Sequence, residues 1–169
     1  MPKVVSLHAR AAFNAQETDD VPITLVTIAH SAIVGGPLRL SSDPTERLSI
    51  DPLKYGTRSR GLVYEFVLMA AVLPDDREDT PTAVQLALEN VSSDMTKAVR
   101  ASITPATMTF ELVMASDPDI VEMRWSGLAA LRATYDAGQI QIEVSRESIL
   151  GEPWPAHRMT QNRFPGLYR

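Results

Sequence analysis

The chain of 169 residues contains no cysteine. This absence excludes disulfide bonds, thiolate zinc sites, iron–sulfur clusters and cysteine nucleophiles. The chain also lacks a run of about 18 apolar residues, the length that a membrane-spanning helix needs. Near the start, His8 and Arg10 interrupt the region where a secretion signal would require an unbroken apolar core. We therefore expect a soluble protein that has no stable membrane insertion and is synthesised in the cytoplasm.

Recognisable catalytic patterns are missing as well. The three histidines, His8, His30 and His157, are far apart and show no metal-ligand spacing, so we interpret them as surface or hydrogen-bonded residues. There is no Gly-x-Ser-x-Gly motif, phosphate-binding loop or dinucleotide-binding fingerprint. Glu89 and Glu111 lie on predicted strands but on their polar side, where a solvated carboxylate is a poor general acid or base. We predict no enzyme activity, no metal site and no cofactor.

The composition is that of an ordinary globular protein, with 44% hydrophobic and 22% charged residues. A chain of this length suits one domain, and we assign it to residues 1–150, followed by an extended C-terminal arm over residues 151–169. The arm has a net charge of +2, which leaves −7 for the rest of the chain out of the total of −5. An acidic body repels the phosphate backbone, which makes sequence-specific DNA binding improbable.

Alternation of apolar and polar residues with a period of two runs through much of the chain, as in strands with one solvated face. We expect residues 62–71 to form a central strand. Residues 22–30 are dense in β-branched residues, which favours a strand covered on most of both faces. Residues 136–138 have the composition of a compact turn between the last two predicted strands. We therefore predict that these two strands form a hairpin. The remaining predicted strands cover residues 38–40, 84–89, 107–114, 121–125, 128–137 and 139–146.

Two short segments have helical spacing instead. Residues 6–16 place Ala9, Ala12 and Phe13 on one face, and a second helix of about ten residues begins near Met95 and ends before Pro105. Seven or eight strands with two short helices indicate a mainly β protein. We predict an antiparallel β-sandwich or flattened barrel with a flanking short α-helix and an N-terminal helix.

Two segments do not fit a compact strand pattern. Residues 41–60 show little periodicity, with at most a short strand near residues 47–50, and connections of this length are often functional or ordered by a partner. The arm contains large aromatic rings without helical or strand periodicity, so these rings need a folded surface, either on their own domain or on a neighbouring subunit. The candidate subunit or partner contacts are the aromatic and basic side chains of both segments: Arg47, Lys54, Tyr55, Arg58, Trp154, Arg158, Arg163, Phe164 and Tyr168.

Four strings carry a resemblance that covers nearly the whole chain: FNAQETDDVPITLVTIAH, LPDDREDTPTAVQLALENVSSDM, ELVMASDPDIVEM and LGEPWPAHRMTQNRFPGLY. They resemble a family of bacteriophage proteins, a domain of unknown function found among the tail genes of long-tailed phages. Members look like minor tail proteins akin to distal tail proteins. The resemblance implies a tail-tube-like fold, repeated around the tail axis as a homo-oligomeric ring of six or three copies. It implies the tail tube, hub and tape-measure proteins as neighbours, and it assigns no functional residue.

From these observations we expect a structural virion protein at the tail tip, a distal tail or baseplate ring that connects tail tube to hub. The acidic body would let DNA pass through the lumen without specific binding. One alternative is a receptor- or carbohydrate-binding module with Trp125 and Trp154 as stacking platforms, although the apolar side of VEMRW favours a core position for Trp125. Another alternative is a tail-associated cell-wall hydrolase.

Overall fold

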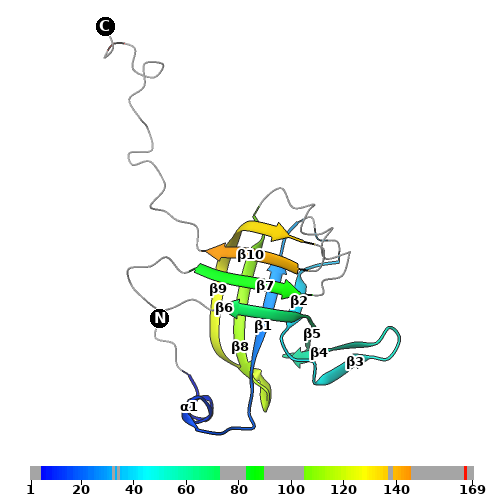
Figure 1. Ribbon diagram of the computed structural model, residues 1–169, viewed down its shortest axis with the longest axis vertical. Helices are drawn as coiled ribbons and strands as arrows, with labels where there is room; N and C mark the ends of the chain where they lie inside the picture. Colours follow the sequence, from blue (N-terminus) through cyan, green and yellow to red (C-terminus); the bar gives the residue numbers. More distant parts are fainter. Residues whose placement is uncertain are drawn as a thin grey trace.

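The computed structural model describes residues 5–31, 33, 35–72, 83–89, 105–136, 139–145 and 166. In these residues ten strands form one sheet that curls into a half-barrel, accompanied by a single short helix (Figure 1). The predicted mainly β fold is therefore confirmed. In chain order the elements are α1 (Leu7–Asn14), β1 (Pro22–Ala29), β2 (Leu38–Ser41), β3 (Glu46–Ser49), β4 (Lys54–Ser59), β5 (Leu62–Phe66), β6 (Leu68–Val72), β7 (Ala83–Glu89), β8 (Thr107–Met114), β9 (Asp117–Tyr135) and β10 (Gln139–Ser145).

The strand order across the sheet is β3-β4-β5-β2-β1-β8-β9-β10-β7-β6. Every neighbouring pair is antiparallel except β2 and β5. Strands β10, β7 and β6 cross in front of β1 and β8, which is how the single sheet encloses a core (Figure 1). The sheet ends at β3 on one side and at β6 on the other, so the half-barrel has two open edges in the described part of the chain.

The main core lies inside the curl and confirms the alternation predicted for three strands. The even-numbered residues of three strands are buried in it: Val84 to Leu88 of β7, Met108 to Leu112 of β8 and Ile140 to Val144 of β10. A smaller cluster on the opposite face of β1 and β8 contains Ile23, Leu25, Tyr64 and Val113. Strand β1 contributes to both clusters, which confirms its predicted burial on both faces.

Strand β9 joins two halves of the molecule. The sequence predicts two strands over residues 121–125 and 128–137, whereas the structure has one long strand that pairs with both β8 and β10. Its register against β8 shifts at three places, and Gly127 has a φ of +70°, which glycine adopts without steric cost. Such bulges bend a strand and increase its twist. The predicted hairpin of β9 and β10 is confirmed, and Asp136 N–H donates to the Gln139 carbonyl at 2.8 Å.

The prediction of a central strand over residues 62–71 is wrong. Strand β5 ends at Phe66, and β6 begins at Leu68 at the opposite edge of the sheet, next to β7. Between them, the Val67 N–H donates to the carbonyl of Ser41, the last residue of β2, at 3.0 Å. This bond holds the chain beside β2 at the point where it leaves β5. Alternation continues through this corner because both strands have the same period, so the sequence pattern does not reveal the break.

The segment over residues 41–60 is largely a β-hairpin and not an irregular loop. Strands β3 and β4 pair with each other, and β4 also pairs with β5. At Gly56 a Cβ atom would lie 1.9 Å from the Tyr64 carbonyl oxygen, so β4 can approach β5 this closely only with glycine. The hairpin projects sideways from the body of the protein (Figure 1).

The predicted N-terminal helix is confirmed as α1. Its N-cap residue Ser6 accepts a hydrogen bond from the Ala9 N–H at 3.1 Å. Within the described residues no helix has the length and apolar character needed to cross a membrane. The second predicted helix, near residues 95–104, and nearly all of the arm over residues 151–169 lie outside the described residues.

Candidate functional site

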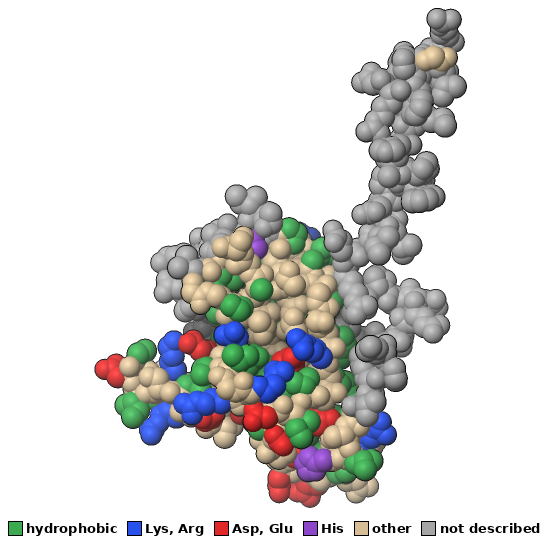
Figure 2. All heavy atoms as spheres, turned by 180° about the vertical axis from the view of Figure 1, so that it is seen from behind, with side chains coloured by type: hydrophobic (Ala, Val, Ile, Leu, Met, Phe, Trp, Pro, Cys, Tyr) green, Lys and Arg blue, Asp and Glu red, His purple; other side chains and the backbone are tan. Residues whose placement is uncertain are grey.

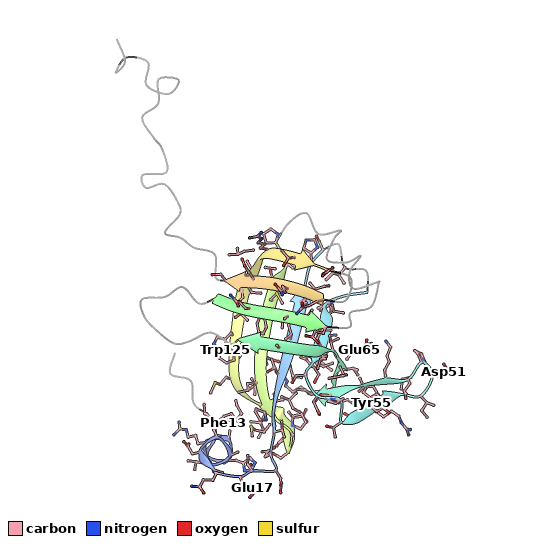
Figure 3. The ribbon with its side chains drawn as sticks, in the orientation of Figure 1. Phe13, Glu17, Asp51, Tyr55, Glu65 and Trp125 are labelled. Carbon is pink, nitrogen blue, oxygen red and sulfur yellow. The ribbon has the colours of Figure 1, made fainter. Side chains whose placement is uncertain are left out.

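The hairpin of β3 and β4, residues 46–59, ends in a turn with exposed apolar side chains; we call this segment the hairpin surface. Ile50 is 75% exposed, Leu53 61% and Tyr55 41%. Figure 3 shows Asp51 and Tyr55 on this projection, well away from Trp125 on β9. Burying one large apolar side chain is worth about 1.5–3 kcal/mol. The hairpin surface thus offers apolar area that the chain's own described residues leave uncovered.

Lys54 and Arg58 lie on one face of the hairpin, where each has a carboxylate partner. Arg58 Nη1 lies 2.6 Å from Glu46 Oε1, and Lys54 Nζ lies 2.5 Å from Glu65 Oε1. Exposed ion pairs of this kind contribute about 0–1 kcal/mol to stability. The pair of Arg58 and Glu46 connects β4 to β3, and the pair of Lys54 and Glu65 connects β4 to β5. These two candidate contacts therefore already help to hold the hairpin in place.

Arg47 and Tyr55 lie directly opposite each other on the other face of the hairpin. Both are exposed, and Arg47 makes no ion pair within the described part of the chain. Arginine and tyrosine are enriched among residues that dominate binding energy at interfaces. The structure therefore brings together two of the nine predicted contact residues in a form suited to binding. The five candidates of the arm, Trp154, Arg158, Arg163, Phe164 and Tyr168, lie outside the described residues.

Sequence reasoning missed the two most exposed large hydrophobic residues of the hairpin surface, Ile50 and Leu53. They flank the Asp51–Pro52 pair in the turn between β3 and β4. An apolar residue on each side of a turn was the available signal, because turns are normally built from small and polar residues. Because residues 41–60 show little periodicity, the sequence does not indicate which of them lie at an exposed hairpin tip.

The prediction that Glu111 is a solvated carboxylate is wrong. Its side chain is only 5% exposed, and both of its oxygens accept hydrogen bonds from the guanidinium of Arg60. Arg124 Nε lies 3.3 Å from Glu111 Oε1. The pKa of the Arg60 guanidinium is raised by the hydrogen bond to Glu111, which outweighs the lowering effect of burial. The side chain that contacts Glu111, that of Arg60, comes from the turn between β4 and β5.

Arg60 is held by its backbone as well as by its guanidinium group. Its backbone N–H donates to the Asp119 carboxylate, and its φ of +51° is uncommon for a residue with a side chain. The register of the sheet places Arg124 directly opposite Glu111. The signal for this cluster was a glutamate in the middle of TMTFELVM, because a carboxylate that becomes buried needs a cationic partner. Only the pairing of distant strands identifies that partner.

A second polar cluster anchors α1 to the sheet. Ser6 donates to Glu122 through both its N–H and its Oγ, each at 2.7 Å. His8 Nε2 lies 2.8 Å from Asp20 Oδ2, and Ser116 donates to Asp20 through its N–H at 3.0 Å and its Oγ at 2.9 Å. Partial burial raises the pKa of Asp20, but the hydrogen bonds from Ser116 and His8 outweigh it and give a net lowering.

This histidine, aspartate and serine do not form a nucleophilic triad. Asp20 Oδ2 and Ser116 Oγ both approach the same nitrogen, His8 Nε2, at 2.8 Å and 3.3 Å. In a catalytic triad the carboxylate and the nucleophile contact opposite ring nitrogens. The cluster is an anchor for the helix, and it confirms the interpretation of His8 as a hydrogen-bonded surface residue.

A comparison with protein families matches residues 8–159 to the Domain of unknown function (DUF1833). The chain belongs to the DUF1833 family. The match includes every described strand, so the hairpin surface and the Glu111 cluster are parts of the family domain. No curated protein matches this chain at a significant level.

Two further residues of the DUF1833 domain bear on the alternative functions. Trp125 is 8% exposed and packs in the main core, so it is not available as a stacking platform. Glu89 is exposed, as the alternation predicts. Among the described residues no group of three or more histidine, aspartate or glutamate side chains is placed to hold a metal ion.

Proposed function

We propose that this DUF1833 protein is a structural virion protein, one subunit of a ring at the tail tip of a long-tailed bacteriophage. The ring would be a distal tail or baseplate component that joins the tail tube to the hub and leaves a passage for DNA. The observation that carries this proposal is the hairpin surface, whose exposed Ile50, Leu53 and Tyr55 need a partner surface. The resemblance of the sequence to phage tail proteins supplies the place of assembly.

The geometry of the sheet offers a route to a closed ring. A contact between two different surfaces of identical subunits closes into a ring when its rotation divides a full turn. The hairpin surface, which includes the open edge at β3, would be one of these surfaces, and the open edge at β6 would give the second. Exposed sheet edges are normally covered or paired. Six copies would match a tail tube, whereas three would match a hub.

The arm would supply a further contact. Its rings and arginines, Trp154, Arg158, Arg163, Phe164 and Tyr168, are residue types that anchor interfaces. The tail tube, hub and tape-measure proteins are the expected neighbours, and the tail tip of the virion is the expected location. The net charge of −5 supports the role of a DNA passage, since acidic walls repel phosphates.

The two alternatives receive less support from the described residues. A carbohydrate-binding module would need exposed aromatic platforms, and Trp125 lies in the core. A cell-wall hydrolase would need a carboxylate that can act as general acid or base in a cleft; Glu89 is exposed, and both oxygens of Glu111 accept hydrogen bonds from Arg60. A cell-wall clearing assay with the purified protein tests the second alternative directly.

The ring proposal is tested by removing the apolar tip. The double variant Ile50→Ser with Leu53→Ser should lose self-association, or association with tube and hub proteins, while its thermal unfolding stays unchanged. Light scattering after size-exclusion chromatography measures the mass. The matched control is Leu131→Ser, because Leu131 is 62% exposed but lies on β9, away from the hairpin. It should assemble like the wild type.

Deletion of the arm, residues 151–169, provides a second test. We expect weaker assembly and an unchanged cooperative thermal transition. Loss of that transition would indicate that the arm covers its own domain. A wild-type protein that stays monomeric even with tube and hub proteins present would contradict the proposal as a whole.

A further inference from the structure

The sheet face opposite the main core carries a hollow of about 240 Å³ that is rich in arginine. Its lining contains three arginines, two threonines, one glutamate and one tyrosine, with Leu62 as the apolar member: Arg39, Arg60, Arg124, Thr27, Thr109, Glu111 and Tyr64. Lys and Arg side chains form a band across the lower half of the body on the side shown in Figure 2. This concentration of positive charge stands out on a protein whose net charge is −5.

Backbone pairing places these side chains together. Arg39 on β2 is opposite Thr27 on β1, and Thr27 is opposite Thr109 on β8. Residues that face each other across neighbouring strands project from the same side of the sheet. The pair of Glu111 and Arg124 lies two residues further along β8, on the same side. The hollow is therefore built on the rigid centre of the sheet.

The charges of the lining do not cancel. Glu111 neutralises one guanidinium and holds two of them in place, Arg60 through both terminal nitrogens and Arg124 through Nε. Arg39 is half-buried, and its guanidinium makes no hydrogen bond or ion pair within the described part of the chain. Arg124 contacts Glu111 through Nε alone among the described residues, which leaves both of its Nη groups available. Three guanidinium groups and one carboxylate give the lining two positive charges in excess.

We propose that this hollow binds a single phosphate group in its dianionic form, as free phosphate or as a phosphate monoester. A monoester carries about −1.5 to −2 charges at neutral pH, which balances the excess of the lining. Guanidinium groups bind phosphate through two parallel hydrogen bonds, and the hydroxyls of Thr27 and Thr109 add donors. Ligand pockets usually measure about 300–1,000 Å³, so this smaller hollow fits one group and not a whole nucleotide.

Glu111 has a positioning role in this proposal. Its carboxylate fixes Arg60 and Arg124 before the ligand arrives, which lowers the entropy lost on binding. A carboxylate ligand would carry only one charge and would leave one guanidinium without compensation. A phosphodiester of nucleic acid also carries one charge and is a weaker match for the same reason. This inference does not depend on ring assembly, because every lining residue belongs to one chain.

Calorimetric titration of the full chain with inorganic phosphate at fixed ionic strength tests the proposal. Arg39→Gln should weaken binding at least tenfold, because it removes charge-assisted hydrogen bonds to the phosphate. The matched control is Arg47→Gln, which removes from the hairpin surface an arginine that has no ion pair among the described residues, and it should leave the affinity unchanged. Thermal unfolding checks that both variants fold. Thr109→Val provides a second lining variant and should also weaken binding.

Two comparisons distinguish the ligand class. Phosphoserine should bind like inorganic phosphate if the hollow accepts monoesters, whereas binding of inorganic phosphate alone would assign it to the free anion. Affinity for phosphoserine should fall from pH 7 to pH 5, since a phosphate monoester takes up its second proton with a pKa of about 6. Equal affinity of Arg39→Gln and wild type, acetate binding as tight as phosphate, or no saturable binding would each overturn the proposal.

Discussion

The ion pair of Arg60 and Glu111 gives the sharpest test of the structure. Arg60→Gln removes the guanidinium that contacts both oxygens of a carboxylate that is only 5% exposed. Breaking a buried ion pair by removing one partner costs about 3–5 kcal/mol. Arg60 is itself 34% exposed, and Arg124 remains 3.3 Å from the carboxylate, so the loss is partly compensated. We expect the free energy of unfolding to fall by roughly 2–3 kcal/mol.

Urea unfolding followed by circular dichroism measures this change. The m value, which is the slope of the free energy of unfolding against urea concentration, should stay constant. For a chain of this size each kcal/mol corresponds to a shift in Tm of about 2–4 °C, so we expect a decrease of roughly 4–12 °C. The matched control is Arg58→Gln, because the pair of Arg58 and Glu46 is exposed. It should cost less than about 1 kcal/mol.

A double-mutant cycle isolates the interaction itself. In the background of Glu111→Gln the carboxylate charge is gone, and Arg60→Gln should then cost less than about 1 kcal/mol. If Arg60→Gln destabilises the protein no more than Arg58→Gln, or equally with and without the Glu111 charge, the argument from the buried carboxylate fails.

Two further predictions concern the helix anchor and the hairpin. Because the pKa of Asp20 is lower in the folded protein, its contribution to stability is present above the unfolded pKa and is lost as pH falls through the folded value. Asp20→Asn should therefore be less stable than wild type in urea unfolding at pH 7, with the difference vanishing in acid; a constant difference would contradict this. Gly56→Ala should cost about 1–3 kcal/mol and speed amide exchange in β3 and β4, because its Cβ would meet the Tyr64 carbonyl oxygen. Unchanged exchange would show that β4 can move away.

Several elements follow directly from local pattern. The alternation of β7, β8 and β10 predicts which of their residues are buried in the main core, because side chains of a strand alternate between faces whatever the partner strand is. The N-terminal helix is likewise identified by the local spacing of its apolar residues. The rule fails where both faces are covered, as at Glu111 and Val113 on β8.

The candidate contacts show the same division. The sequence selects Arg47, Lys54, Tyr55 and Arg58 by residue type, but it does not separate the exposed pair Arg47 and Tyr55 from the ion-paired Lys54 and Arg58. The faces of a hairpin follow from its register, and the register depends on the close approach of β4 to β5 at Gly56. No periodicity within residues 41–60 contains that information.

The sequence by itself determined a mainly β chain, the strands that fill the core and the acidic charge of the molecule. These properties depend on neighbouring residues or on a sum over all residues. Only the tertiary structure decided that residues 62–72 divide between two distant parts of the sheet, that the hairpin projects, and that Arg39, Arg60 and Arg124 line one hollow with Glu111. These features depend on pairing between strands far apart in the chain, and strand pairing is a property of the folded sheet.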